Sequence, residues 1–172
     1  MPRHPAVGYL RLVRAMRATA IALLTTAACV IAAEPDVPAA IEKLADSPSR
    51  VVLYSLDPIK HTDSVEPEKT FHEYIIRGRA DIIDAAERRA LVQTLARGAR
   101  DATPNMTHAC FNPRHGLRVE QGSYAADFVI CFECLQVQAC GFQPADFFLT
   151  SAAPQPTFDE SLRHHNLPLP EK

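Results

Sequence analysis

The pattern of apolar and polar positions first becomes helical after Asp36. Ile41, Leu44 and Ala45 recur at helical spacing and form one apolar face. Asp36 stands where an N-cap is needed, because its carboxylate can accept a backbone N–H of the first turn. Pro48 has no backbone N–H to continue a helix. The pattern therefore predicts a helix that starts at Asp36 and ends just before Pro48.

A second and clearer helical pattern follows Asp84, again a suitable N-cap. Its apolar stripe consists of Leu91, Val92, Leu95 and Ala99. Gly98, near its end, predicts a C-terminal cap, since glycine adopts the left-handed conformation at little cost. A short third helix is predicted from Thr157, where residues 157–160 (TFDE) match a capping box, to Asn166.

Runs of β-branched, aromatic and apolar residues between the helices predict strands. The runs cover residues 50–56, 71–83, 107–120 and 123–137, and the polar segment 60–69 is a predicted loop. Gly78 predicts a bulge or bend in the second run. This order of elements predicts a single α+β domain with a mainly antiparallel sheet of about four strands and helices on one face. We place the domain at residues 34–172, with a less ordered C-terminal tail.

The last two runs are typical of a β-hairpin that turns at Gln121-Gly122. In that register Leu117 faces Ala126, and apolar residues of both strands share one face of the sheet. A slip by one residue would instead set Leu117 against Asp127. Residues 127–137 (DFVICFECLQV) are apolar on both faces over their middle, which predicts a central strand.

Residues 1–33 contain the parts of an export signal. Four arginines and no acid precede sixteen uncharged residues that end in Ala32-Ala33. The uncharged stretch is shorter than the about 20 apolar residues of a membrane span. We therefore predict a signal peptide at residues 1–33 and export to the periplasm or cell envelope.

Two alternatives concern the same segment. Residues 26–29 (TAAC) resemble a bacterial lipoprotein cleavage box, in which case Cys29 carries a lipid anchor and the protein contacts the membrane only through it. The other alternative is an N-terminal anchor that is not cleaved.

Charge and composition exclude several partners. Without residues 1–33 the chain keeps 14 basic and 20 acidic residues, so its net charge changes from −2 to −6. An acidic chain with no Lys/Arg cluster argues against nucleic acid and against an anionic membrane surface as partner. Apolar residues make up 47% of the sequence, which excludes wholesale disorder. No phosphate-loop, metalloprotease or hydrolase motif is present, and no cofactor is predicted.

Four cysteines follow the signal: Cys110, Cys131, Cys134 and Cys140. Export favours disulfides. In one strand the Cα atoms of residues 131 and 134 would be about 10 Å apart, beyond the limit of about 7 Å for a disulfide. We therefore expect Cys110 to pair with Cys131 and Cys134 with Cys140, or else Cys110 with Cys134. Zinc on Cys131 and Cys134, completed by Cys110, His115 or Cys140, is the alternative, but a strand would direct the two sulfurs to opposite faces, so no metal is predicted.

Polar residues of the hairpin form the candidate binding surface: Asn112, Arg114, Asp127 and Glu133. Arg114 can hold a carboxylate or phosphate through two parallel hydrogen bonds. In the alternative interpretation Arg114 pairs internally with Asp127 or Glu133 and ties the hairpin together. His115 is expected to be packed in the core or at its rim.

The segments 110–116 (CFNPRHG) and 130–134 (ICFEC) resemble a family of uncharacterised bacterial exported proteins. The resemblance covers about residues 50 to 140 and implies the hairpin as the shared feature, without an assigned activity.

The sequence thus favours a binding or accessory module of the periplasm or envelope, whose partner is a small molecule or an envelope protein. The alternative is a thiol-dependent or zinc-containing enzyme that uses Cys110, Cys131 and Cys134. A thiol enzyme requires a cysteine, a histidine and an orienting residue that converge in space. On a regular strand, residues 110 and 115 would point to opposite faces.

Overall fold

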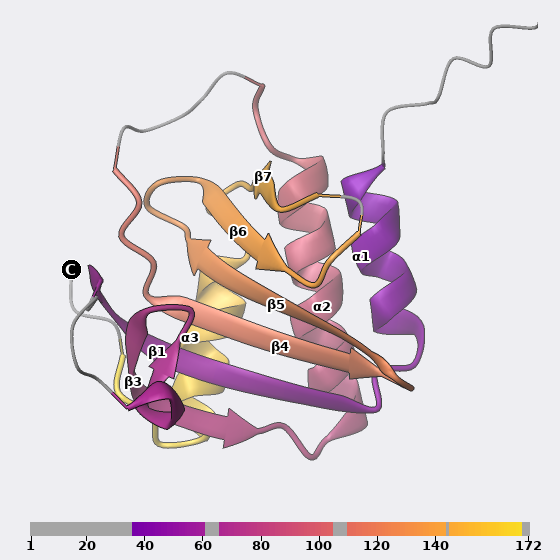
Figure 1. Cartoon of the computed structure of the whole chain (residues 1–172). Coiled ribbons are helices and arrows are strands. Elements are labelled where there is room, and N and C mark those ends of the chain that lie inside the picture. The colour runs from indigo at the N-terminus through magenta and orange to yellow at the C-terminus, as the bar shows by residue number, and fades with distance from the viewer. Residues whose placement is uncertain (1–35, 61–65, 105–109, 144, 170–172) are drawn as a thin grey trace, which may run out of the picture. The chain divides into compact units, whose positions relative to one another are not determined.

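The computed structural model describes residues 36–60, 66–104, 110–143 and 145–169 (Figure 1). The predicted signal peptide, including Cys29, lies outside these ranges. None of the helices formed by the described residues has both the length and the apolar character needed to cross a membrane.

The first two helices begin where their caps were predicted. Oδ1 of Asp36 accepts the N–H of Ala39 at 3.0 Å ahead of α1 (Val37–Asp46), and Oδ1 of Asp84 accepts the N–H of Glu87 at 2.7 Å ahead of α2 (Ala85–Arg100). Both predicted N-caps are therefore confirmed. The predicted C-terminal cap at Gly98 is wrong, because α2 continues past it.

Gly98 has a packing role instead. A Cβ at this position would lie 2.5 Å from Oγ1 of Thr150 and against the ring of Pro154. The missing side chain lets α2 approach the segment that leads into α3 (Gln155–His164). This third helix begins at Gln155 without a side-chain cap, so the predicted start at Thr157 is wrong, and the chain leaves it at Asn166, which has a positive φ of 55°.

The described residues form one antiparallel sheet in the order β2-β3-β1-β4-β5-β6-β7. Its strands are β1 (Arg50–Lys60), β2 (Thr70–Phe71), β3 (Tyr74–Asp81), β4 (His115–Gln121), β5 (Tyr124–Cys131), β6 (Gln136–Cys140) and β7 (Phe147–Leu149). The α+β class and the antiparallel sheet are confirmed in outline, but seven strands replace the predicted four or so. The segment after Cys140, part of which was predicted to be less ordered, contains β7 and α3.

Two tight turns account for much of the difference in strand number. His72 and Glu73 both have positive φ and form a two-residue turn that separates β2 from β3, inside the segment predicted as one strand. A second turn, at residues 132–135, ends β5 at Cys131 and starts β6. A short 3₁₀ helix (Pro67–Lys69) precedes β2.

The β4–β5 hairpin turns one residue later than predicted, at Gly122-Ser123, and Gly122 has a φ of 62°. Leu117 consequently pairs with Phe128 rather than with Ala126. The predicted register is wrong by two residues, but an even shift preserves the apolar face because side chains alternate with a period of two. The bulge predicted at Gly78 is confirmed. Ser55 of β1 pairs with Gly78, but the next residue, Leu56, pairs with Ile76, so the β1–β3 register shifts directly beside Gly78.

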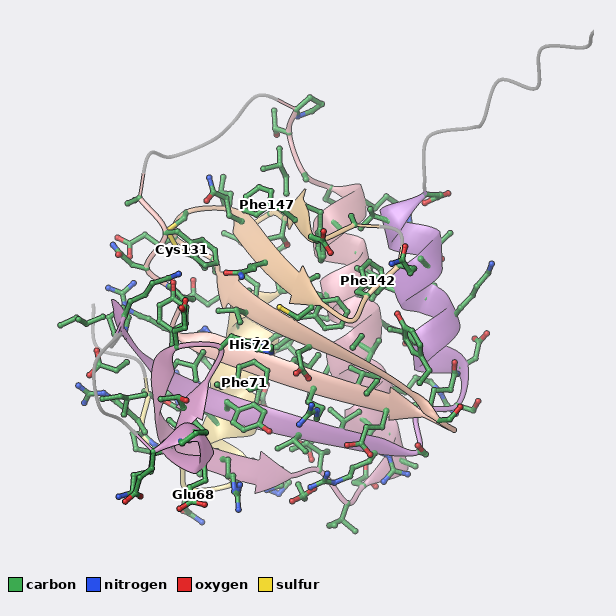
Figure 2. All side chains as sticks on the ribbon, in the orientation of Figure 1. Glu68, Phe71, His72, Cys131, Phe142 and Phe147 are labelled. Atoms are coloured by element: carbon green, nitrogen blue, oxygen red, sulfur yellow. A yellow bond between two sulfur atoms is a disulfide. The ribbon has the colours of Figure 1, made fainter. Side chains whose placement is uncertain are left out.

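All three helices lie on one face of the sheet and enclose the main core (Figure 1). Its fully buried members include Leu53 and Leu117 from the sheet, Leu95 from α2 and Phe158 from α3. A smaller apolar cluster covers the opposite face, where Phe71 stacks on Tyr54 with ring centroids 4.3 Å apart. Figure 2 shows Phe71 and the adjacent His72 on this face of the sheet.

Candidate functional site

The CFEC segment (residues 131–134) forms a turn between β5 and β6. Cys131 is the last residue of β5, and the turn brings its Cα within 5.1 Å of the Cα of Cys134. The two sulfurs form a disulfide. The prediction that residues 131 and 134 lie in one extended strand, too far apart to pair, is therefore wrong. The turn reverses the chain just where the apolar pattern suggested that the strand continues.

The other two cysteines are free thiols, so the predicted pairings of Cys110 with Cys131 and of Cys134 with Cys140 are wrong. Cys140 lies at the far end of β6, opposite Asp127, because β6 runs antiparallel to β5. Burial raises the pKa of the Cys140 thiol, and nearby carboxylates raise it further.

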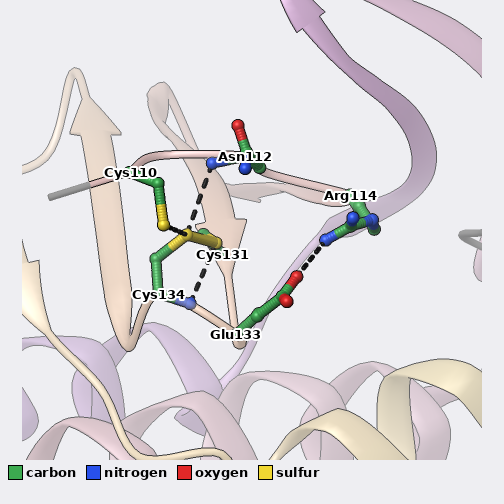
Figure 3. Close-up of a disulfide and its surroundings, with 6 residues drawn as sticks. All are labelled: Cys110, Asn112, Arg114, Cys131, Glu133 and Cys134. Atoms are coloured by element: carbon green, nitrogen blue, oxygen red, sulfur yellow. Dashed lines mark hydrogen bonds and ion pairs between the residues drawn. A yellow bond between two sulfur atoms is a disulfide. The ribbon is translucent and has the colours of Figure 1, made fainter. Parts of the chain in front are cut away.

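Cys110, by contrast, lies beside the disulfide. Its Sγ is 3.9 Å from Sγ of Cys134, and Figure 3 shows the sulfur of Cys134 between those of Cys110 and Cys131. The backbone N–H of Asn112 also points at Sγ of Cys134, at 3.3 Å. The three cysteines of the predicted cluster thus meet, although in an arrangement that the sequence did not indicate.

The predicted polar surface divides into two parts. Arg114 forms an ion pair with Glu133 at 2.6 Å, which ties the start of β4 to the CFEC turn (Figure 3). This is the internal pairing that the sequence left open for Arg114. Asn112, Arg114 and Glu133 all line the same pocket.

Asp127 does not belong to that pocket. It lies on the sheet face opposite the helices, where its Oδ2 is 2.8 Å from Nε2 of His72 and its Oδ1 is 3.0 Å from Nε of Arg118. The structure therefore does not bring Asp127 together with the other three predicted binding residues, because the turn at residues 132–135 carries Glu133 away from the line of β5 while Asp127 stays within the strand.

The pocket has a volume of about 600 Å³ and lies between the CFEC turn, the start of β4 and helix α3. Its apolar lining consists of Phe132, Leu135, Ala152 and Leu169. Its polar lining consists of Asn112, Arg114, His115, Glu133, Gln155, Asp159 and Arg163. Small-molecule sites likewise combine apolar side chains with polar groups that fix the orientation of the ligand, although this lining is more polar than most.

His115 and Asp159 form the buried part of the wall. Nε2 of His115 is 2.9 Å from Oδ1 of Asp159, and the imidazole packs against the rings of Phe132 and Phe158. His115 is only 2% exposed, in agreement with the expectation that it is packed. The hydrogen bond from His115 lowers the pKa of the Asp159 carboxyl, assisted by the charge of Arg163, while burial opposes the shift.

Three residues of α3 were absent from the predicted site: Gln155, Asp159 and Arg163. They follow one another at intervals of four residues, so they share one face of the helix. That polar stripe was the feature of the sequence that could have indicated these three pocket residues. Sequence alone could not connect it with the CFEC turn, because the contact between His115 and Asp159 spans 44 positions.

A further group of possible metal ligands joins α2 to the end of α3. Nε2 of His165 is 3.1 Å from Oε1 of Glu87, and Nδ1 of His164 is 3.9 Å from Oε2 of the same carboxylate. One ligand atom from each of the three residues lies within 4.8 Å of the others. The Oγ of Ser161 donates a hydrogen bond to Oε1 of Glu87, so this carboxylate oxygen has a protein partner without an ion.

Comparison with known protein families, with curated proteins and with solved structures finds no match to this chain. The resemblance based on the CFNPRHG and ICFEC segments therefore stays a prediction.

Proposed function

We propose that this protein is a binding module whose pocket at the CFEC turn takes a small organic anion with an apolar body. The observation that carries the proposal is the pocket of about 600 Å³, in which apolar side chains and two arginines face the same space. This volume is in the range of sites for small molecules.

The apolar part of the ligand would lie against Phe132, Leu135 and Leu169. Leu169 is 40% exposed, so a bound ligand would remove apolar surface from water at this edge of the pocket.

The anionic group would be held by the arginines. Arg163 forms no ion pair within 4 Å with any described residue, so its guanidinium is available to a carboxylate, sulfonate or phosphate. Nε of Arg114 is buried without a hydrogen-bond partner among the described residues, although its Nη1 is paired with Glu133. The side chain of Arg114 is 19% exposed, so a ligand anion would meet the accessible part of the guanidinium rather than the buried Nε.

A direct test uses 8-anilinonaphthalene-1-sulfonate as probe, since it combines aromatic rings with one anionic group. We expect saturable binding to one site, followed by fluorescence. Arg163→Ala should weaken binding about 5- to 30-fold, the equivalent of about 1 to 2 kcal/mol for one charge-assisted contact.

Arg89→Ala is the matched control, because Arg89 is an exposed arginine of α2 outside the pocket. It should bind the probe like the unmodified protein. Equal affinities for Arg163→Ala and Arg89→Ala, or an absence of saturable binding, would contradict the proposal.

We further propose that the module acts in the periplasm or cell envelope, with a small molecule or an envelope protein as partner. The signal-like pattern of residues 1–33 supports this location. The disulfide at the CFEC turn is also compatible with an oxidising compartment. Mass spectrometry of the protein recovered from a cell fractionation would test the location, the cleavage site and the lipid on Cys29 together.

A further inference from the structure

We propose that Cys110, Cys131 and Cys134 form a thiol–disulfide exchange site, in which the exposed thiol of Cys110 connects the buried disulfide to an external dithiol or disulfide substrate. This proposal does not rest on the ligand pocket, because it concerns only the three sulfurs and the groups that hold them.

The disulfide is buried, whereas the thiol of Cys110 is accessible to solvent. Cys131 is 1% exposed and Cys134 is fully buried, so an external thiol cannot easily reach either sulfur. Cys110 is exposed, and its sulfur lies 3.9 Å from that of Cys134, close to van der Waals contact (Figure 3). Among the described residues, Cys110 is therefore the exposed thiol that can connect the buried disulfide to a thiol in solution.

The position of Cys110 determines which disulfide sulfur it can attack. Sγ of Cys134 lies 3.9 Å from Sγ of Cys110 and is the nearer of the two disulfide sulfurs (Figure 3). Thiol–disulfide exchange proceeds by attack of a thiolate on one disulfide sulfur, while the other sulfur leaves. The arrangement thus makes Cys134 the attacked atom and Cys131 the leaving group.

A backbone hydrogen bond stabilises Cys131 as the leaving group. The backbone N–H of Cys134 donates to Sγ of Cys131 at 3.1 Å. A thiolate on Cys131 would keep this hydrogen bond, which becomes stronger when the acceptor is charged. The N–H of Asn112 donates to Sγ of Cys134 at 3.3 Å and fixes the attacked sulfur beside Cys110.

The internal step is balanced without an added oxidant. The electron pair of the Cys110 thiolate forms a bond to Sγ of Cys134, the bond between Cys134 and Cys131 breaks, and its electron pair leaves on Sγ of Cys131. The proton that Cys110 released is returned to Cys131. One disulfide replaces another, and the oxidation state of the protein does not change.

The external step exchanges this new disulfide with the substrate. A substrate thiolate attacks Sγ of Cys110 and releases Cys134 as a thiolate, which takes up a proton. The second thiol of the substrate then displaces Cys110 from the mixed disulfide. In sum, one substrate dithiol is oxidised to its disulfide while Cys131 and Cys134 are reduced to thiols, and the reverse direction reduces a substrate disulfide.

Two serine variants test which sulfur Cys110 attacks. In Cys131→Ser, oxidised in air, peptide mapping by mass spectrometry should find Cys110 linked to Cys134. In Cys134→Ser, a link between Cys110 and Cys131 should form at most at a trace level, because the sulfur of Cys110 lies beside that of Cys134 and the sulfur of Cys131 lies beyond it (Figure 3). Absence of the first link, or equal amounts of the two, would overturn the proposal.

The unmodified protein supplies an independent measurement that does not depend on the folding of a variant. After incubation in a glutathione redox buffer and trapping with iodoacetamide, we expect a fraction of molecules with Cys110 linked to Cys134. If only the link between Cys131 and Cys134 is found, the exchange does not occur and the proposal fails.

A kinetic comparison tests the role of Cys110 as the entry point. With dithiothreitol as substrate, Cys110→Ser should slow reduction of the buried disulfide by about tenfold or more. Cys140→Ser, which removes the other free thiol, should react at the rate of the unmodified protein. A rate for Cys110→Ser within about twofold of that of Cys140→Ser would show that the disulfide is reduced without Cys110.

Discussion

The pair formed by His115 and Asp159 gives the sharpest test of how the pocket wall is built. Its hydrogen bond is 2.9 Å long, and the side chain of His115 is only 3% exposed. Replacing Asp159 by alanine would leave a buried imidazole N–H without its acceptor. An orphaned buried donor costs about 1 to 3 kcal/mol, and the charge on the acceptor places the expected loss near the middle of that range, about 2 kcal/mol.

The assay is urea denaturation at pH 7, followed by circular dichroism because the chain has no tryptophan. In a parallel thermal denaturation, a loss of about 2 kcal/mol in a domain of this size corresponds to a fall in Tm of about 6 to 10 °C. Asp159→Asn keeps an oxygen acceptor but not the charge, so it should lose less than Asp159→Ala. Glu160→Ala is the matched control, since Glu160 is the next residue of the same helix and is an exposed acid.

The pH dependence tests the cause of this stabilisation. The pKa of Asp159 is lowered from its ordinary value of 3.8, first by the hydrogen bond from His115. A carboxyl whose pKa is lower in the folded state stabilises the protein above its unfolded pKa, and this contribution is lost as the pH falls through the folded pKa. The stability difference between the unmodified protein and Asp159→Asn should therefore be full at pH 6 and shrink below about pH 3.8. If the loss of unfolding free energy for Asp159→Ala at pH 7 lies within about 0.5 kcal/mol of the loss for Glu160→Ala, the result would refute a stabilising role of the bond between His115 and Asp159.

Three further predictions concern other parts of the fold. Gly116→Ala should lower the free energy of unfolding by about 1 to 3 kcal/mol in urea denaturation, because the added Cβ would lie 2.8 Å from the ring of Phe71; an unchanged midpoint would contradict this packing. Iodoacetamide at pH 8 should modify Cys110 well before Cys140, since Cys110 is exposed whereas burial raises the pKa of the Cys140 thiol; equal rates by mass spectrometry would argue against the difference. Glu133→Ala should change the free energy of unfolding by less than about 1 kcal/mol, because the side chain of Glu133 is 69% exposed and such pairs are weak; a larger loss in thermal denaturation would show that this ion pair is a main tie of the turn.

The site could be predicted only in part. Asn112, Arg114 and Glu133 were found from their polarity on an apolar hairpin, and they do line one pocket. Asp127 satisfied the same criterion, but it is paired with His72 and Arg118 on the other face of the sheet. A polar residue within an apolar hairpin therefore indicated that the side chain has a polar neighbour. It did not show whether that neighbour is another residue of the protein or a ligand.

Local interactions are what the sequence determined by itself. The caps at Asp36 and Asp84, the apolar faces of α1 and α2 and the bulge at Gly78 each depend on residues close together in the chain, so their pattern is visible in the printed sequence. The alternation of the β4–β5 hairpin survived an error in register for the same reason, since the period of two belongs to the strand itself.

Tertiary structure decided where the strands end and which sulfurs meet. The CFEC segment has the apolar flanks of a strand, but in the folded chain it is part of a turn in which Leu135 has a φ of 57°. That turn halves the distance between two cysteines that an extended chain would keep apart, and it brings Cys110 to the disulfide across 24 positions. The disulfide joins residues only three apart, but the apolar flanks of residues 131–134 concealed the turn that allows it. The pocket and the contact of Cys110 with Cys134 join residues distant in sequence, which depend on the path of the whole chain and could not be obtained from local pattern.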